Sequence, residues 1–230
     1  MKDMPDFSGY SPTAYENESY KSKSLLSYCM KKSHKLLENQ FSKKDFFDKV
    51  IEIGSGIGIH LDYVRHQYNN YLMTDYSDEV IKILESRAYS EKISIKKIDG
   101  GAMELPFPDN CFDRLIASHV LEHIYHPEKT LREWNRIVKN GGIISIALPC
   151  DPGIAHRFGR YISTRRYSKR HGISCSAYDV YMALQHVNPI INLRSMIEYL
   201  FENKKIYYWP FPVRSMDINL FYLVNIKIEK

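Results

Sequence analysis

A short apolar run that breaks into alternating glycines is the feature that most constrains this chain. Residues 49–58 read KVIEIGSGIG. The β-branched residues of the run suit a strand that is covered on both faces. Gly54, Gly56 and Gly58 permit positive φ and leave no Cβ in the path of a ligand. The segment IGIHLDYVRHQY continues the turn as a predicted helix, so the stretch has the strand, glycine loop, helix order of a nucleotide-binding unit.

An acidic residue in the next apolar run indicates what this loop binds. Asp75 ends YLMTD at about the 20-residue spacing of an acid that binds ribose hydroxyls. The dinucleotide fingerprint G-x-G-x-x-G is broken, because Ile59 occupies its last position. Glu52 would repel a pyrophosphate and would suit a positively charged ligand. These residues disfavour NAD and favour S-adenosylmethionine, whose sulfonium and ammonium groups are both cationic.

Strands and helices alternate along most of the chain, which predicts a parallel sheet with a ligand at the carboxyl ends of its strands. After the first strand we expect strands at 70–75, 93–98, 112–117 and 142–148, and helices at 16–38, 78–89, 127–139 and 192–201. Two final apolar runs, within 204–211 and 219–228, are separated by a short link that favours antiparallel pairing. The predicted fold class is α/β, Rossmann-like, with a seven-stranded mostly parallel sheet, helices on both faces and a C-terminal antiparallel hairpin.

Length and composition favour one domain. The 230 residues, 44% of them hydrophobic, can bury one substantial core. We expect a single domain over 1–230, with an N-terminal helical segment at 1–45, a cofactor-binding core at 46–148, a basic cap insertion at 149–190, and a C-terminal helix and hairpin at 191–230.

The remaining composition argues for a soluble cytoplasmic protein. No apolar run reaches the roughly 18 residues of a membrane span, and MKDMPDFSGYSP has no signal-peptide core. Cys29, Cys111, Cys150 and Cys175 form no C-x-x-C pair, so we expect them to be reduced and structural.

Four motifs in a fixed order resemble the class I S-adenosylmethionine-dependent methyltransferases, in particular a small bacterial group with LPFPDxxFD and LEH signatures. They are VIEIGSGIG, TDYSDEVI, AMELPFPDNCFDRLIASHVLEHI and HPEKTLREWNRIVKNGGIISIALP, over residues 49–149. The resemblance implies an enzyme that converts S-adenosyl-L-methionine to S-adenosyl-L-homocysteine.

The resemblance also assigns cofactor contacts. The implied cofactor-binding residues are Glu52, Gly54, Ser55, Gly56, Gly58, Asp75, Tyr76, Asp99, Gly101, Ala102, Met103, Ser118 and His119. Asp75 would take both ribose hydroxyls. The family commonly has an aspartate at the position of Gly101, where it binds the adenine amino group; here Asp99, or the backbone of residues 101–103, would replace it.

Three histidines are candidates for a catalytic base, which methyl transfer needs mainly when the acceptor is a hydroxyl. They are His119, His123 and His186, and for each a structural role is the alternative. The segment HVLEH also matches the H-x-x-E-H pattern of a zinc peptidase. That pattern must lie within a helix, whereas here it follows a predicted strand directly, so we expect no metal.

The excess positive charge lies in the predicted cap. Between Pro152 and Tyr178 there are six basic residues and no acid, while the rest of the chain carries 26 basic and 27 acidic residues. Arg157, Arg165, Arg166 and Tyr178 are therefore candidates to bind a phosphate and stack on a ring. A solvated basic face is the alternative.

These features favour a small, anionic acceptor, and by analogy with the bacterial relatives a hydroxyl of a phosphorylated or nucleotide-linked sugar or glycan precursor. The alternatives are an RNA methyltransferase, with the basic segment following phosphates, and a non-catalytic cofactor-binding regulator. The sequence shows no appended RNA-binding module, so nucleic acid is the less favoured partner.

Overall fold

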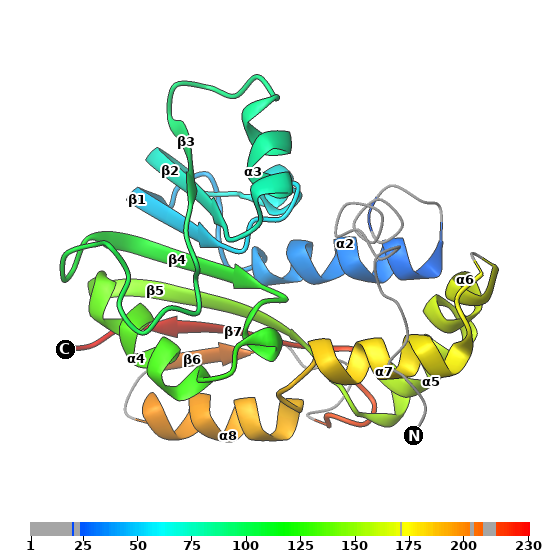
Figure 1. Cartoon of the computed structure of the whole chain (residues 1–230). Helices are drawn as coiled ribbons and strands as arrows, with labels where there is room; N and C mark the ends of the chain where they lie inside the picture. Colours follow the sequence, from blue (N-terminus) through cyan, green and yellow to red (C-terminus); the bar gives the residue numbers. More distant parts are fainter. Residues whose placement is uncertain (1–19, 21–23, 171, 203–204, 209–214) are drawn as a thin grey trace.

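A computed structural model describes residue 20 and residues 24–170, 172–202, 205–208 and 215–230. Its centre is a sheet with the strand order β3-β2-β1-β4-β5-β7-β6 (Figure 1). The strands are β1 (Phe46–Ile53), β2 (Gln67–Asp75), β3 (Ile93–Lys97), β4 (Phe112–Ser118), β5 (Val138–Pro149), β6 (Lys205–Tyr208) and β7 (Phe221–Lys227). The first five strands pair in parallel, and β7 is antiparallel to both β5 and β6. The predicted mostly parallel Rossmann-like sheet with an antiparallel C-terminal pair is confirmed.

Helices cover both faces of this sheet. The helices are α2 (Leu25–Leu37), α3 (Asp78–Glu85), α4 (Pro127–Ile137), α5 (Ile154–Ile162), α6 (Thr164–Arg170), α7 (Cys175–Gln185) and α8 (Ile190–Leu200). One core cluster joins the sheet to α4 and α8, for example through Trp134 and Ile197. A second joins the other face to α2 and α3, through Leu37 and Leu84. Helices α5, α6 and α7 gather beyond the carboxyl ends of the parallel strands (Figure 1).

The connection between β1 and β2 differs from the sequence prediction. Instead of a helix over IGIHLDYVRHQY, the structure has one 3-10 turn, His60–Tyr63. The physical reason is the register of the two strands. Gln67 pairs with Phe46 at the start of β1. The chain must therefore cross back from the carboxyl ends of the strands to their amino ends within a few residues of the 3-10 turn.

Two further expectations can be compared with the structure. All four cysteines are free. Within the residues that the structure describes, no helix has both the length and the apolar character needed to cross a membrane. Of the expected N-terminal helix at 16–38, residues 16–19 and 21–23 lie outside the described part of the chain.

A buried ion pair fastens α2 to the sheet. Glu38 Oε1 lies 2.5 Å from Arg114 Nη2, and both side chains are fully buried. Arg114 also donates to Ser145 Oγ on β5, and its guanidinium lies 3.9 Å from the ring centroid of Phe41. His60 Nε2 is 3.1 Å from the same Glu38 oxygen. Burial raises the pKa of Glu38, but Arg114 and His60 lower that pKa by more, so the carboxylate stays ionised.

We expect Glu38→Gln to destabilise the protein by about 3–5 kcal/mol, because it leaves the buried Arg114 charge uncompensated. The measurement is urea unfolding followed by circular dichroism. The double variant Glu38→Leu, Arg114→Met should cost much less than the sum of its single changes. Glu128→Gln, in the exposed Glu128–Arg132 pair on α4, is the control and should leave the unfolding midpoint nearly unchanged. Equal effects of Glu38→Gln and Glu128→Gln would show that the buried pair stabilises the fold no more than an exposed pair does.

Candidate active site

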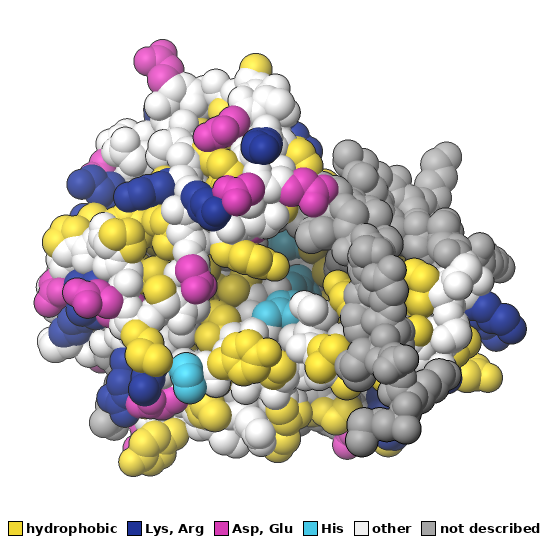
Figure 2. Space-filling model, viewed as in Figure 1, with side chains coloured by type: hydrophobic (Ala, Val, Ile, Leu, Met, Phe, Trp, Pro, Cys, Tyr) yellow, Lys and Arg dark blue, Asp and Glu magenta, His cyan; other side chains and the backbone are white. Residues whose placement is uncertain are grey.

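A cavity of about 1030 Å³ opens at the carboxyl ends of the parallel strands. Its walls come from α2, the glycine loop, the ends of β2 and β4, and helices α5 to α7. Figure 2 shows histidine side chains recessed in a hollow between hydrophobic ones on this face. The cavity therefore lies where the topology of an open parallel sheet places a ligand.

The glycine loop and Asp75 form one end of the cavity. Gly54, Gly56 and Gly58 all have positive φ, between 51° and 79°. The Asp75 carboxylate accepts hydrogen bonds from the backbone N–H of Gly56, at 3.2 Å, and of Ser77, at 2.9 Å. Each carboxylate oxygen keeps capacity for a further donor. The carboxylate is therefore held in place beside the loop and can accept hydrogen bonds from two neighbouring hydroxyls of a ligand.

Glu52 lies behind this loop and is almost completely buried. It accepts a hydrogen bond of 2.7 Å from the Tyr71 hydroxyl, and burial raises its pKa. Burial also raises the pKa of Asp75. Neither carboxyl forms an ion pair with any described residue. Both would gain from a positively charged ligand.

Most of the predicted cofactor residues line the cavity. They are Glu52, Gly54, Ser55, Gly56, Asp75, Tyr76, Asp99, Gly101, Ser118 and His119. Three others are not among its lining residues: Gly58, Ala102 and Met103. Gly58 has a φ of 79°, which residues with a Cβ rarely adopt, so the backbone conformation of the turn favours glycine here. Met103 is exposed, and Ala102 packs against the hydrophobic core.

The chain leaves β4 through a strained turn that faces the cavity. His119 has a φ of 59°, a left-handed conformation that is costly for a residue with a Cβ. Its Nε2 lies 3.2 Å from Ser33 Oγ on α2. Burial, followed by the neighbouring histidines, lowers its pKa to about 3, so the ring is neutral. Residues Leu121–His123 form a 3-10 turn and not an α-helix, which agrees with the rejection of a zinc-peptidase motif.

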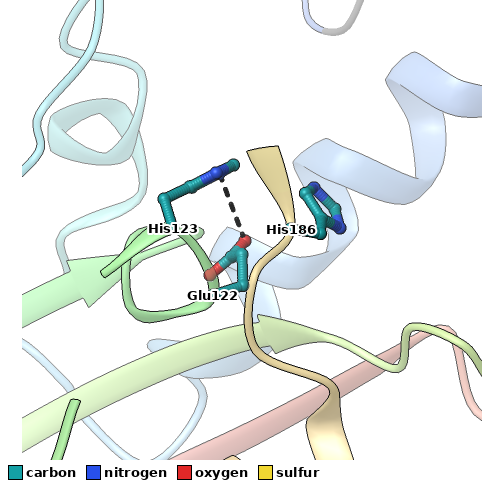
Figure 3. Close-up of side chains that lie close together, drawn as sticks. All are labelled: Glu122, His123 and His186. Carbon is teal, nitrogen blue, oxygen red and sulfur yellow. Dashed lines mark ion pairs between the residues drawn. The ribbon is translucent and has the colours of Figure 1, made fainter. Parts of the chain in front are cut away.

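Glu122 is buried beneath this turn. Its carboxyl is 2% exposed, and its Oε2 has no hydrogen-bond partner among the described residues. Burial raises its pKa to about 8. The His123 Nε2 atom lies 3.9 Å from Glu122 Oε1 (Figure 3). The His123 Nδ1 atom lies 2.8 Å from the Gln185 carbonyl.

His186 reaches the same place from the C-terminal end of α7. Its Nδ1 lies 2.8 Å from Asp151 Oδ2, and Arg160 Nη1 donates to that oxygen at 2.9 Å. Burial raises the pKa of Asp151, but the neighbouring His156 and His186 and the charge of Arg160 lower it by more, so Asp151 is ionised. The structure thus brings together His119, His123 and His186, the three predicted base candidates, at one wall of the cavity.

Sequence reasoning missed Glu122, Asp151, His156 and Arg160, all of which lie in this region. The LEH motif itself contained Glu122, but only the fold shows that its side chain points inward. Asp151 follows β5 directly, at the same sheet edge as Asp75. That position at a strand end was the signal that could have identified it.

The predicted cap residues divide into two groups. Tyr178 is buried, lines the cavity and lies 2.6 Å, hydroxyl to hydroxyl, from Thr164. The three predicted arginines are not among the lining residues. Arg165 pairs with Asp179 at 3.0 Å, and Arg157 and Arg166 are exposed. The cap cation that reaches the cavity is Arg160, which the sequence did not single out.

An open, mostly parallel sheet with a glycine loop, a following acidic strand end and a cavity at the strand tips defines an α/β protein that binds a ribose-containing cofactor. The chain aligns over 95% of its length with 99% of an Aquifex aeolicus S-adenosylmethionine-dependent methyltransferase of known structure. The TM-score is 0.58 at 14% sequence identity, which shows a shared fold.

Family comparison gives the particular class. Residues 51–146 match the family described as a methyltransferase domain. The chain is similar to 2-methyl-6-phytyl-1,4-hydroquinone methyltransferase 1 of Oryza sativa subsp. japonica, with 30% identity over 45% of this chain and 32% of that protein. It is also similar to demethylmenaquinone methyltransferase of Geobacillus stearothermophilus, with 36% identity over 30% of each. The chain spans about a third of the length of these curated relatives.

Residues 51–146 thus match a methyltransferase domain, as the four motifs predicted. The cavity fits this cofactor on physical grounds. Glu52 and Asp75 are buried carboxyls without a cationic partner among the described residues, and Ser118 Oγ is buried without a hydrogen-bond partner there. A sulfonium and an ammonium group would compensate such carboxylates.

We expect Asp75→Ala to weaken S-adenosylmethionine binding at least tenfold, because a charged hydrogen bond contributes roughly 1.5–3 kcal/mol. Isothermal titration calorimetry would measure the dissociation constant. Asp78→Ala is the matched control, since Asp78 is exposed in the next helix and pairs with Lys97. A dissociation constant that Asp75→Ala leaves unchanged would show that the ribose lies elsewhere.

Proposed function

We propose that this protein transfers a methyl group from S-adenosylmethionine to a hydroxyl of a small-molecule acceptor bound at the histidine-lined wall of the cavity. The observation that carries the proposal is that one cavity joins two kinds of surface. The glycine loop and Asp75 form one end, and His119, His123 and His186 line another wall. Donor and acceptor could therefore lie in register, which is the main requirement of an in-line displacement.

His186 is the best candidate for the proton acceptor. S-adenosylmethionine, when bound, supplies an electrophilic methyl group. If the Nδ1–H group of His186 donates to the ionised Asp151, this hydrogen bond fixes the His186 tautomer that has its lone pair on Nε2. Such a nitrogen can take the proton of a hydroxyl as its oxygen attacks the methyl carbon, and Asp151 stabilises the resulting imidazolium. His119 is a weaker candidate, because burial lowers its pKa to about 3 and makes it a poor base.

For the acceptor we propose a phosphorylated or nucleotide-linked sugar or glycan precursor. Cations on α5 and α6 are exposed, and no acid lies between Pro152 and Tyr178. Such a surface could bind phosphates at the rim of the cavity while the sugar hydroxyl enters it. Arg160 offers a cation within the cavity itself. The division into a basic cap insertion at 149–190 and a C-terminal helix and hairpin at 191–230 remains part of this proposal, as does the assignment of Arg157, Arg165 and Arg166 to acceptor binding.

A hydroquinone-type acceptor is the second candidate. The cavity is lined by Leu25, Leu26, Ile124, Met182 and Phe221 as well as by polar groups. Such walls suit an aromatic ring that carries hydroxyls. Two of the similar proteins have names that refer to quinone or hydroquinone methylation, although the chain covers only about a third of each.

The experiment that tests the function uses the purified full chain with S-adenosylmethionine labelled on its methyl group. The acceptor panel holds nucleotide sugars, sugar phosphates, hydroquinones and RNA. Label in a sugar supports the first proposal, and label in a hydroquinone replaces it with the second. Label in RNA would establish the nucleic-acid alternative. Cofactor binding with no labelled product from any class would favour a non-catalytic regulator and overturn the enzymatic proposal.

We expect His186→Ala to lower kcat by about a hundredfold or more with a hydroxyl acceptor, as removal of a general base does. The dissociation constant for S-adenosylmethionine should not change, because the residue lies on the acceptor wall. Asp151→Asn should lower kcat through the orientation of His186 and shift the pH profile. A kcat that His186→Ala leaves unaltered would remove this residue from the reaction.

A further inference from the structure

We propose that Glu122, His123 and His186 form a binding site for one divalent transition-metal ion at the acceptor wall of the cavity. One ligand atom of each residue lies within 4.8 Å of those of the other two. Figure 3 shows the three side chains grouped, with Glu122 and His123 from the turn after β4 and His186 from the end of α7. The proposal departs from the sequence-based expectation of no metal.

The orientation of the two imidazoles is the main support for this site. His123 Nδ1 lies 2.8 Å from the Gln185 carbonyl, and His186 Nδ1 lies 2.8 Å from Asp151 Oδ2. The Gln185 carbonyl and the ionised Asp151 carboxylate can only accept a hydrogen bond, so each Nδ1 must carry the hydrogen. Each Nε2 then carries the lone pair that a metal requires. A carbonyl or carboxylate bonded to the far nitrogen is the outer-shell arrangement of metal-bound histidines.

The third ligand is a carboxylate without a local counter-charge. Glu122 Oε2 is buried and has no hydrogen-bond partner among the described residues. Glu122 Oε1 lies 3.9 Å from His123 Nε2 and 3.8 Å from His119 Nδ1. Leaving a buried carboxyl in this state is costly, and a bound cation would satisfy it.

The cluster is held by backbone contacts between its two segments. The Asn188 N–H donates to the Glu122 carbonyl at 3.2 Å, and Asn188 Nδ2 donates to the carbonyls of Leu121 and Ile124. The spacing needs only a small adjustment. In a tetrahedral site with metal–nitrogen distances of about 2.1 Å, ligand atoms lie about 3.4 Å apart, which is within side-chain rotation of the present arrangement.

The ligand set decides the class of ion. Two imidazoles and one carboxylate suit Zn²⁺, Co²⁺ or Fe²⁺, whereas Mg²⁺ prefers oxygen ligands throughout. Three protein ligands leave a coordination position open toward the cavity, where His123 is 40% exposed. There the oxygen of an acceptor hydroxyl could bind, and the ion would lower the pKa of that hydroxyl so that its proton passes to solvent water as the oxygen attacks the methyl carbon and the thioether leaves. This role rests on the proposed function: with the ion bound, His186 is its ligand and the ion replaces His186 as the group that activates the hydroxyl.

The test measures metal binding without donor or acceptor. The full chain is stripped with EDTA, dialysed and titrated with Co²⁺ by visible absorption, and with Zn²⁺ and Mg²⁺ by competition with a chromogenic chelator. We expect one Co²⁺ or Zn²⁺ per chain and no Mg²⁺. Glu122→Gln, His123→Ala and His186→Ala should each weaken binding at least tenfold. His126→Ala, which removes an exposed histidine outside the cluster, should retain wild-type affinity.

A second readout guards against variants that fold poorly. Zn²⁺ should raise the Tm of the wild-type protein and of His126→Ala but not of Glu122→Gln, with circular dichroism confirming that the variants are folded. The site would be overturned if the wild-type protein did not bind Co²⁺ or Zn²⁺ stoichiometrically. It would also be overturned if all three cluster variants bound the ion with wild-type affinity. Full methyl transfer in EDTA by a protein that binds Co²⁺ would overturn only the role of the ion in the reaction.

Discussion

The buried contact between Glu38 and Arg114 is the interaction on which the rest of this architecture depends. It joins the end of α2 to the central strand β4, at a point where neither charge meets solvent. His60 shares the same carboxylate and continues through His34 to the Tyr20 hydroxyl. Because His60 lies in the turn after the glycine loop, the pair also fixes the loop that forms one end of the cavity. A structural ion pair thus sets the position of a ligand-binding wall.

The parallel sheet explains why so many polar groups meet in one place. Glu52, Asp75, Ser118 and Asp151 stand at or next to the ends of four different strands, and parallel pairing brings those ends to one edge. Each is buried or nearly so, and therefore expensive unless a ligand or a neighbour compensates it. Asp151 is compensated by His186 and Arg160, whereas Glu52 and Asp75 have no such cation among the described residues. The difference separates Asp151, whose charge the protein itself compensates, from the loop end of the cavity, whose carboxyls favour a cationic ligand.

Local signals in the sequence were sufficient for the sheet and for the loop end of the cavity. The apolar runs and the glycines predicted β1 and the cavity edge, and the spacing to Asp75 predicted the residue beside the loop. The prediction of a helix after the glycine loop was wrong. The register of β1 and β2 is a non-local property, and it leaves room for only one 3-10 turn before Gln67. The pairing of Glu122 with His186 could not be predicted either. The proximity of Glu122 and His186 depends on how α7 returns over the sheet. The hydrophobic periodicity of the sequence does not predict the path of that helix.

Hydrogen bonds between the end of α7 and the turn after β4 hold the histidine-lined wall of the cavity together. His123 Nδ1 is bonded to the Gln185 carbonyl of the cap, and Asn188 bonds three carbonyls of the turn after β4. The helices between residues 149 and 190 are therefore attached at the histidine-lined wall of the cavity, and not only through their apolar side chains. A change that shifts α7 would move His186 relative to Glu122. Substitutions in these helices could then alter the histidine-lined wall while the loop end of the cavity keeps its geometry.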